Sequence, residues 1–461
     1  MDFRSKLALA FGKLTLKINR LTGSGGTAAP GLIAQKIDPQ ILSKLANHLS
    51  FGAIIVTGTN GKTTTSRILS GILKEAGFSL IHNRTGSNLI RGIVSTLIQA
   101  SDSVGNLPAD LGLFEVDEFT LPLALTQIQP KVVVITNLFR DQLDRYGEID
   151  TIKKHWKEAL QQLPAESIVI LNGDDPSVAH LGQNLKCKVL YFGLEDKTTA
   201  LTVKYHATDS TRCQDCGNDL DYEVYFISHL GKYHCPKCNL SRPNPQIFAR
   251  EIKLESTIGS DFLVNQPETA FNIHLNVPGL YNVYNALAAI SVAYSLKIRQ
   301  NKIEEGLKNF KSAFGRIEQI QIGEKSILLT LVKNPVGFNE ILRMIFSEGT
   351  KRNVMICIND LFADGRDVSW LWDVDFELMK NKTDHLTISG LRAEDMAVRI
   401  KYAEIGEENL KVVKNLPEAI KTALDSTPKD KTLYVLPTYT AMLEIRKTLN
   451  KFGYVGQFWE E

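Results

Sequence analysis

The sequence predicts an α/β protein with a large, mainly parallel sheet followed by a smaller α/β domain. Three observations support this fold class. Short apolar runs alternate with helical stretches from residue 51 to about residue 193, and the same alternation returns after residue 313. Between these regions, residues 200–245 break the pattern and carry four of the six cysteines. A chain of 461 residues is long enough for two or three domains.

The composition is that of an ordinary globular protein. Hydrophobic residues make up 43% and charged residues 23% of the chain, and the net charge is +2. This charge provides no general attraction to nucleic acids or membranes. No apolar run approaches the ~20 residues needed to cross a bilayer, and the first residues do not have the pattern of a signal peptide. We therefore expect a cytoplasmic protein.

Residues 1–50 are expected to form an N-terminal amphipathic helix and a linker. Apolar side chains recur at helical spacing at Phe3, Leu7, Ala10, Leu14 and Ile18. Basic side chains accompany them at Arg4, Lys6, Lys13, Lys17 and Arg20. The simpler interpretation is a helix packed on its own protein, but a basic amphipathic helix can also lie on an anionic membrane. "GSGGTAAPG" (23–31) indicates a flexible break before the main body.

The central domain is expected to span residues 51–312. Its predicted strands share a short apolar core bounded by turn residues, and they cover 51–58, 111–116, 131–138, 167–175 and 188–193. Helical stretches lie between them, and a further strong helix is expected within 276–296. This alternation favours a largely parallel sheet with helices on both faces.

The C-terminal domain is expected to span residues 313–461. Four predicted strands cover 326–332, 354–359, 385–390 and 432–438. The last of these precedes the helical "YTAMLEIRKTLNKFG". The segment predicts a second, smaller Rossmann-like α/β unit.

The stretch "VTGTNGKTTTS" (56–66) predicts a phosphate-binding loop between a strand and a helix. Gly58 and Gly61 let the backbone turn tightly, so that the N–H groups at the start of the helix can hold phosphates. Lys62 would reach the β- and γ-phosphates, and the Thr63 hydroxyl would face Mg²⁺. The predicted ATP-binding set is Gly58, Thr59, Asn60, Gly61, Lys62, Thr63 and Thr64.

Two C-x-x-C pairs, Cys213–Cys216 and Cys235–Cys238, predict a zinc ribbon within about residues 200–245. Each pair can present two thiolates from one turn, which together make a tetrahedral Cys₄ site. Four cysteine ligands leave no open position for catalysis, so the zinc is expected to be structural. A redox dithiol is the alternative. Acidic residues offset the few basic ones in this segment, which argues against nucleic-acid binding.

These motifs resemble those of the Mur ligase superfamily, whose members form amide bonds with ATP. The phosphate loop, "FEVDEFTL" (114–121), "TNLFRDQLDRYGE" (136–148), "LNGDDP" (171–176), "YNVYNALAA" (281–289) and "GRIE" (315–318) follow the order of that family's motifs. The resemblance covers most of residues 50–460 and implies a Mur-ligase-like central ATPase domain with an inserted zinc ribbon.

The resemblance also implies roles for individual residues. Glu115 would bind Mg²⁺ together with Thr63, with Glu118 as the fallback. Asn285 would contact the adenine and Arg316 the ATP phosphates.

The sequence departs from the family pattern at four points. Gln142 replaces a metal-binding His, which puts a second Mg²⁺ site in doubt. Lys157 lies near the position of the family's carbamylated lysine, but a solvated helix lysine is the simpler interpretation. Thr330 stands where the family has a ribose-binding Asp. Only about 50 residues precede the phosphate loop, so we do not expect the usual UDP-linked substrate.

The ribbon insertion, "VKNPVGFNE", "DGRDVSWLWD" and "LPTYTAMLEIR" resemble one subgroup, the ATP-using subunits of lipid II isoglutaminyl synthases. The resemblance implies that the α-carboxyl of D-glutamate in the lipid II stem peptide is amidated during peptidoglycan synthesis. It also implies a GatD-like glutaminase as the partner that supplies ammonia. The lipid-linked substrate adds the inner face of the cell membrane as a hypothetical location.

Outside the four ribbon cysteines, only Cys187 and Cys357 remain, and both lie in ordinary strand contexts. The chain alone is therefore not expected to hydrolyse glutamine, which commonly needs a cysteine nucleophile with a histidine base. Two alternatives remain. One is a single-chain ligase of the folylpolyglutamate synthase type, and the other is a nucleotide-switched zinc-ribbon scaffold.

Five aspartates crowd into "VMICINDLFADGRDVSWLWDVDFE" (354–377). No histidine lies nearby to complete a metal cage. The resemblance implies that one carboxylate of this domain completes the Cys–His pair of the partner. We assign that role to Asp367, with Asp364 and Asp360 as fallbacks, while capping of a helix is its simpler role. Asp373 and Asp375 are expected within that helix, solvated or salt-bridged.

Overall fold

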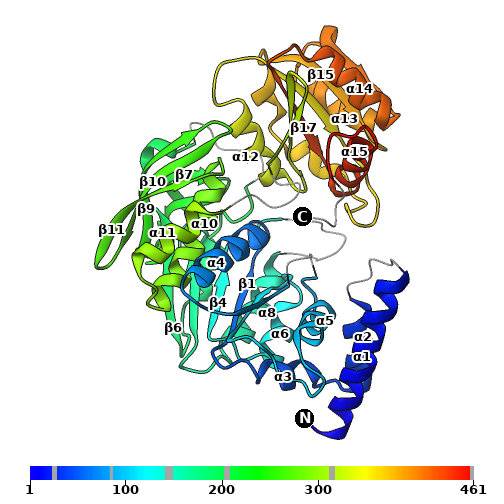
Figure 1. Ribbon diagram of the computed structural model, residues 1–461. Helices are drawn as coiled ribbons and strands as arrows, with labels where there is room; N and C mark the ends of the chain where they lie inside the picture. Colours follow the sequence, from blue (N-terminus) through cyan, green and yellow to red (C-terminus); the bar gives the residue numbers. More distant parts are fainter. Residues whose placement is uncertain (23–27, 84–86, 141–148, 202–207, 311–316, 457–461) are drawn as a thin grey trace.

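The protein is described by a computed structural model that covers residues 1–22, 28–83, 87–140, 149–201, 208–310 and 317–456 (Figure 1). The large central sheet and its helices form the body of the molecule, the first helices lie at one edge, and the C-terminal domain lies at one end. The predicted α/β fold class is confirmed.

The central sheet has nine strands in the order β11-β10-β9-β6-β5-β4-β1-β3-β2. Its parallel part consists of β1 (Gly52–Thr57), β2 (Leu80–His82), β3 (Leu111–Glu115), β4 (Val132–Ile135), β5 (Ile168–Asn172) and β6 (Lys188–Leu194). Five of these strands were predicted. The sixth, β2, lies at the edge and is three residues long, so its hydrophobic signal is weak.

Three further strands extend this sheet beyond β6 and were not predicted. They are β9 (Ile247–Glu255), β10 (Gly259–Gln266) and β11 (Thr269–Leu275). β9 pairs with β6 in parallel, whereas β10 and β11 continue as antiparallel neighbours. Exposed and buried residues alternate along β11. Such half-exposed strands carry a period-2 pattern, so they lack the apolar runs that predicted the other strands.

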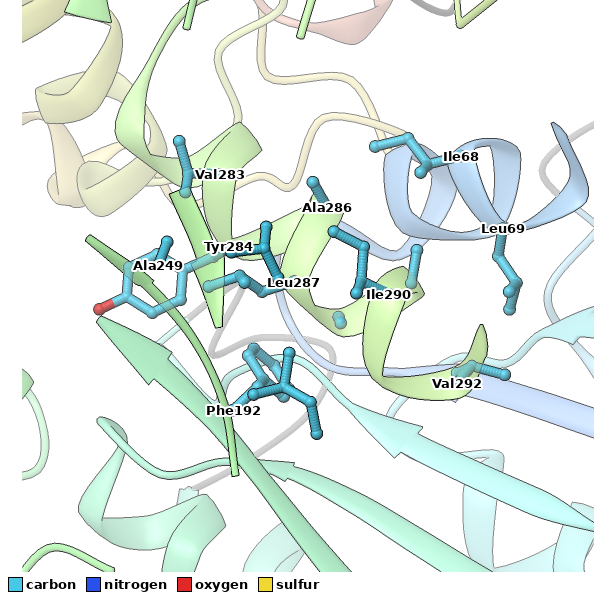
Figure 2. Close-up of a cluster of buried hydrophobic side chains, with 14 of the residues drawn as sticks. Ile68, Leu69, Phe192, Ala249, Val283, Tyr284, Ala286, Leu287, Ile290 and Val292 are labelled. Carbon is cyan, nitrogen blue, oxygen red and sulfur yellow. The ribbon is translucent and has the colours of Figure 1, made fainter. Parts of the chain in front are cut away.

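Helices cover both faces of the central sheet, as predicted. One face is covered by α4 (Lys62–Glu75), α10 (Leu280–Ser295) and α11 (Gln300–Lys308). The other is covered by α5 (Ile90–Ala100), α6 (Leu121–Gln127), α8 (Ile149–Leu160) and α9 (Pro176–Leu181). Helix α10 is buried along most of its length, and Figure 2 shows its side chains between the sheet and α4. This packing fixes the position of α10 beside the phosphate loop.

The N-terminal segment forms α1 (Phe3–Thr22), α2 (Ala29–Ile37) and α3 (Ile41–Ala46). The helix α1 packs through Ser5, Ala8, Leu9 and Gly12, whereas the apolar stripe predicted from the sequence is exposed. The helix therefore does lie on its own protein, but through a different face from the one expected. The helix α2 begins inside the predicted break at 23–31. No helix in the described part of the chain is long and apolar enough to cross a membrane.

The C-terminal domain contains a six-stranded sheet in the order β12-β13-β17-β14-β15-β16. These strands are β12 (Glu318–Ile322), β13 (Lys325–Leu329), β14 (Arg352–Cys357), β15 (Thr383–Ser389), β16 (Leu410–Val412) and β17 (Thr432–Pro437). Only β12 is antiparallel to its neighbour. The main helices are α12 (Pro335–Ile345), α13 (Ala393–Tyr402), α14 (Leu416–Ser426) and α15 (Tyr439–Lys451).

Two short 3₁₀ helices, η2 (Ser369–Asp373) and η3 (Phe376–Met379), stand where one continuous helix was expected after Asp367. The expectation of a single helix is wrong. The backbone leaves the helical region at Val374, which is extended with ψ 132°. Asp375 is buried there and accepts a hydrogen bond from Asn339 Nδ2 at 2.6 Å, so the expectation of a solvated side chain is wrong for this residue.

Candidate functional site

The predicted phosphate loop connects the buried strand β1 to α4. Gly58 and Gly61 have φ values of +129° and +88°, which side chains with a Cβ rarely adopt. A Cβ on Gly58 would lie 2.2 Å from Thr136 Oγ1, and one on Gly61 would lie 2.0 Å from Asn285 Oδ1. Both glycines are thus required by conformation and by space. The loop ends where α4 begins, and the N–H groups at the start of a helix can hold an anion.

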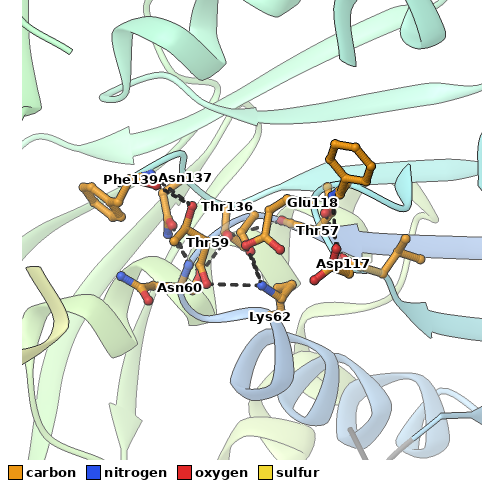
Figure 3. Close-up of polar contacts among 12 residues, drawn as sticks. Thr57, Thr59, Asn60, Lys62, Asp117, Glu118, Thr136, Asn137 and Phe139 are labelled. Atoms are coloured by element: carbon orange, nitrogen blue, oxygen red, sulfur yellow. Dashed lines mark hydrogen bonds and ion pairs between the residues drawn. The ribbon is translucent and has the colours of Figure 1, made fainter. Parts of the chain in front are cut away.

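The loop is held by the segment that follows β4, as Figure 3 shows. Thr59 N donates to the Asn137 carbonyl, and Asn60 N donates to Asn137 Oδ1 at 2.8 Å. The Thr136 hydroxyl and Asn137 Nδ2 both donate to the Asn60 carbonyl. The Thr59 hydroxyl donates to the Phe139 carbonyl. Thr136 and Asn137, which begin the "TNLFRDQLDRYGE" motif, therefore brace the loop.

Lys62 is buried and uses its three N–H groups within the site. Its Nζ donates to the carbonyls of Gly58 and Thr59 and forms an ion pair with Glu118 Oε1 at 2.8 Å (Figure 3). Burial raises the pKa of the Glu118 carboxyl, and the charges of Lys62 and Lys333 oppose that rise. A phosphate could contact Lys62 only by replacing one of these partners.

The two acidic candidates for a metal ligand differ in their surroundings. Glu118 pairs with Lys62, whereas Glu115 ends β3 beside the loop strand β1. The Glu115 side chain is buried, and its carboxylate has no hydrogen-bond or ion-pair partner within the described part of the chain. Glu115 therefore remains the better-placed carboxylate for a hard cation, which prefers oxygen ligands.

The C-terminal domain contributes a side chain that the sequence analysis did not select. Asn334 Nδ2 donates to Asn60 Oδ1 at 2.9 Å, and Asn60 Nδ2 donates to Asn334 Oδ1 at 3.3 Å. Asn334 also caps α12, because its Oδ1 accepts a hydrogen bond from Gly337 N. The sequence analysis noted Thr330, which is buried just beyond β13. It did not predict that Asn334, four residues further on, contacts the phosphate loop of the central domain.

The remaining predicted nucleotide residues fall into two groups. Asn285 on α10 is buried against Gly61 and accepts a hydrogen bond from the Thr65 hydroxyl. Thr63 and Thr64 lie in the first turn of α4. Arg316 and Gln142 lie outside the described residues, so the structure does not place them.

Lys157 on α8 is not a solvated lysine, and its ammonium is occupied away from the loop. Its Nζ donates to the carbonyls of His180, Leu181 and Gln183, at the C-terminal end of α9. Burial lowers the pKa of this amine. The side chain caps a helix end, where a positive charge is favoured by the helix dipole.

The four ribbon cysteines meet in one cluster, as predicted from their spacing. Their Sγ atoms all lie within 4.8 Å of one another, and the Cys213–Cys238 and Cys216–Cys235 pairs are 3.4 and 3.5 Å apart. A tetrahedral zinc with Zn–S bonds of about 2.3 Å requires S···S distances of about 3.8 Å. Asn218 donates to the Cys216 sulfur, and hydrogen bonding from Asn218 lowers the pKa of Cys216 to about 6. The cluster fits a thiolate-bound metal.

The ribbon hairpin, β7 (Asp221–Ile227) and β8 (Leu230–His234), is docked firmly on the central domain. The Tyr233 hydroxyl donates to the Gly173 carbonyl. Next to it, Asp174 accepts hydrogen bonds from Arg242 Nε at 2.6 Å and from the Tyr284 hydroxyl of α10 at 2.7 Å. From the C-terminal domain, Arg343 donates to the carbonyls of Phe226 and Thr199. The ribbon is therefore a packed part of the molecule.

The aspartates after β14 have distinct partners. Asp360 forms an ion pair with Arg392 at 2.8 Å. Asp364 is buried and accepts hydrogen bonds from the N–H and hydroxyl of Thr440 in the first turn of α15. Asp367 is exposed, and its Oδ1 accepts a hydrogen bond from Ser369 N at 2.8 Å. Asp373 lies 3.7 Å from Arg140. The structure does not bring these carboxylates into a metal cluster.

Large apolar side chains are exposed around this aspartate loop. They include Leu361, Phe362, Trp372, Leu391 and Tyr402. Trp372 and Tyr402 contact each other edge to face at 5.3 Å, and Leu391 N donates to Asn359 Oδ1 beside Asp360. An exposed apolar group of this size on an otherwise ordinary surface is typical of a protein contact site.

The phosphate loop, the parallel sheet around it and the C-terminal α/β domain define an ATP-dependent ligase of the Mur ligase fold. Residues 56–235 match the family described as Mur ligase middle domain, and residues 331–442 match the MurT ligase C-terminal family. The chain belongs to the MurT family, the MurT subunits of glutamine-hydrolysing lipid II isoglutaminyl synthase.

Relatives support this membership over the full length. The chain is 33% identical to the MurT subunit of Streptococcus pneumoniae, with 97% of this chain and 98% of that protein covered. It is 32% identical to the subunit of Staphylococcus aureus strain COL, covering 98% and 100%. Among solved structures, a pseudomurein peptide ligase type C from Methanothermus fervidus matches with a TM-score of 0.68 and 26% identity, covering 88% of this chain and 79% of that one.

Proposed function

We propose that the chain is the ATP-dependent subunit of a glutamine amidotransferase that acts on lipid II in peptidoglycan synthesis. The carboxylate that receives the phosphate would be the α-carboxyl of D-glutamate in the stem peptide, and the product would be D-isoglutamine. The phosphate loop with its buried Lys62–Glu118 pair, in a chain related over its full length to MurT subunits, carries this proposal.

The reaction needs two group transfers. A carboxylate oxygen attacks the γ-phosphorus of ATP, and the bond between that phosphorus and the bridging β-phosphate oxygen breaks. ADP departs, and the substrate carboxylate has become an acyl phosphate. The nitrogen of ammonia then attacks the acyl carbon. Phosphate departs with the electrons of the C–O bond, and the nitrogen loses a proton to give the amide. The protein's main task is to hold the reactants and to balance the charge of the phosphates.

Within the site, the residues would divide the work as follows. Lys62 would exchange Glu118 for a phosphate, and the N–H groups around Gly61 and Thr63 would hold the phosphate oxygens. Asn285 and Arg316 would contact the nucleotide. Thr63 and Glu115 would hold Mg²⁺, which when bound supplies positive charge to the phosphates. The four-cysteine cluster would hold a structural Zn²⁺ and take no part in the chemistry.

The ammonia would come from a GatD-like glutaminase partner. Burial raises the pKa of Cys187, and it raises the pKa of Cys357 to about 12, so neither thiol has the character of a nucleophile. Of the three candidate aspartates, Asp360 and Asp364 are already committed to Arg392 and Thr440. Asp367 is exposed beside the apolar group at Phe362, which would contact the partner. Asp367 is therefore the carboxylate that we assign to the partner's histidine.

We propose that the chain has the three parts that the sequence predicts. Residues 1–50 support the central domain, residues 51–312 bind ATP, and residues 313–461 contact the partner and close over the phosphate loop. A lipid-linked substrate would place the reaction in the cytoplasm at the inner face of the membrane.

The test is amidation of lipid II by the chain with and without a co-expressed glutaminase. With the partner present, Asp367→Asn should lower glutamine-driven amidation on the order of 10²-fold or more, while ammonium chloride still supports the reaction. Asp425→Asn, which changes an exposed carboxylate on α14 of the same domain, is the matched control and should retain both activities. Glutamine-driven activity of the chain alone, or extension of the stem peptide by an amino acid, would overturn the proposal. Full glutamine-driven activity of Asp367→Asn would overturn the assignment of Asp367.

A further inference from the structure

One face of helix α1 carries an unbroken row of exposed apolar side chains. Phe3, Leu7, Phe11, Leu14, Ile18 and Leu21 recur every three or four residues, and each is at least 40% exposed. This spacing places all six on one side of an α-helix. Isolated exposed apolar residues are common, but a continuous row over a 20-residue helix is not.

The opposite face of α1 holds the helix in place. Ser5, Ala8, Leu9 and Gly12 are buried against the protein. A Cβ on Gly12 would lie 2.8 Å from Ile98 Cδ1 of α5, so the two helices approach closely. At the first turn, Lys44 bridges Asp2 and Asp38 with two contacts of 2.8 Å. These contacts fix the orientation of α1, which lies along the outer edge of the molecule (Figure 1), so that the row faces solvent.

The charges beside this row have one sign. The sequence of α1 contains no Asp or Glu, whereas it contains Arg4, Lys6, Lys13, Lys17 and Arg20. Lys6 and Lys17 are exposed and lie along one flank of the row at helical spacing. Two copies of α1 placed face to face would bring these like charges together. An anionic lipid surface would instead pair with them while the apolar side chains enter it.

We infer that α1 is an in-plane membrane anchor, whose exposed apolar row inserts into the interface of an anionic bilayer while its lysines contact the headgroups. The anchor would bind the bilayer parallel to its surface without crossing it. This inference rests on the surface of α1 alone and does not depend on the reaction proposed above.

The test is flotation of the full-length chain with vesicles that contain neither lipid II nor nucleotide. Vesicles of phosphatidylglycerol and phosphatidylcholine should bind the chain, and vesicles of phosphatidylcholine alone should bind it about tenfold more weakly. The double variant Leu14→Glu with Ile18→Glu should lower binding by tenfold or more, on the order expected for losing two inserted side chains. Lys6→Glu with Lys17→Glu should remove the preference for anionic vesicles.

Ile258→Glu is the matched control, because Ile258 is also exposed and apolar but lies in the turn between β9 and β10. It should bind vesicles as the unchanged chain does. Removal of residues 1–20 is a poorer test, since it deletes the buried Ala8 and Leu9. Equal binding of the Leu14/Ile18 variant and the unchanged chain would overturn the inference. A second result would also overturn it. The unchanged chain would fail to bind vesicles, and light scattering would show that it forms a dimer, or a complex with the glutaminase, that the Leu14/Ile18 variant loses.

Discussion

Lys62 and Glu118 lie 2.8 Å apart although 56 residues separate them in the chain. The phosphate loop supplies the lysine, and the acidic segment after β3 supplies the carboxylate. Their pairing leaves Glu115 without a partner among the described residues, which is the distinction that the sequence could not make. At this scale the structure thus refines the assignment of two carboxylates that are three residues apart.

Glu340 on α12 gives a pH-dependent prediction. It is buried, with Arg343 Nη1 3.8 Å away, and burial raises the pKa of its carboxyl to about 7. Because the folded-state pKa lies above the unfolded value, this group favours folding below the unfolded pKa, and that contribution is lost as pH rises through about 7. A shift of this size corresponds to roughly 3 kcal/mol. The urea concentration at the unfolding midpoint should therefore be lower at pH 8 than at pH 5.5.

The variant Glu340→Gln separates this carboxyl from all other titrating groups. It keeps the size and shape of the side chain but cannot ionise, so its urea midpoint should fall less between the same two pH values. Both proteins can be followed by circular dichroism in parallel titrations. An equal change of midpoint in the two proteins would show that Glu340 is not the responsible group.

Among the elements, the long buried parallel strands were predictable, whereas the half-exposed extension of the central sheet and the shortest strands were not. The strands β1, β4 and β5 are buried on both faces, and so they read as plain apolar runs. The strand β11 has one exposed face, and β16 is three residues long. The helix expected after Asp367 breaks at Val374 because the chain turns there to bury Phe376. Tertiary packing determines these strands and this helix break, and the local sequence pattern carries no information about that packing.

The candidate site divides in the same way. The loop glycines, Lys62 and the four cysteines were predictable because each has a spacing tied to its chemistry. The roles of Asn334 and Lys157 were not, because Asn334 depends on a loop and Lys157 on a helix end that only the fold brings near them. Arg343 is a similar case, since an arginine on a helix gives no sign that it will bind two distant carbonyls.

The four-cysteine cluster gives a prediction for a single element. The purified chain should contain about one equivalent of zinc, and Cys216→Ser should lose it, because three thiolates bind less tightly than four. Metal content can be measured by mass spectrometry after gel filtration. Cys187→Ser is the matched control, since Cys187 is a buried cysteine outside the cluster, and it should keep its zinc. Full zinc content in Cys216→Ser would contradict the assignment.

For the whole molecule, polar contacts among the described residues join the C-terminal domain to the central domain. Asn334 pairs with Asn60, Arg343 binds the carbonyls of Phe226 and Thr199, and Asp373 lies near Arg140. The first is made by the phosphate loop itself. Nucleotide binding and the position of the C-terminal domain should therefore be coupled through Asn60.

Asn334 allows the interdomain contact to be tested apart from helix capping. Asn334→Asp keeps an acceptor for Gly337 N but loses the donor to Asn60 Oδ1. It should raise the KM for ATP several-fold, about what one lost hydrogen bond costs, with little change in the unfolding midpoint. Asn334→Ala should raise the KM and also lose about 1 kcal/mol of stability.

The control is Asn415→Ala, because Asn415 caps α14 with the same kind of bond, to Glu418 N. It should lose similar stability and leave the KM for ATP unchanged. Steady-state kinetics and urea titrations measure the two quantities. An unchanged KM in Asn334→Asp would mean that the Asn60 contact does not influence nucleotide binding.

The hydrogen bond from Arg343 to the ribbon hairpin has a consequence for folding during synthesis of the chain. Ribosomes complete residues 213–238 before they reach residue 343, and domains generally fold in the order of their synthesis. The cysteine cluster can therefore be loaded with metal while the helix that will clasp its hairpin does not yet exist. A chain that leaves the ribosome without metal would offer Arg343 a less ordered Phe226 carbonyl on the hairpin. Metal supply would then decide, during translation, which newly made chains close into a whole enzyme and which are left for proteolysis.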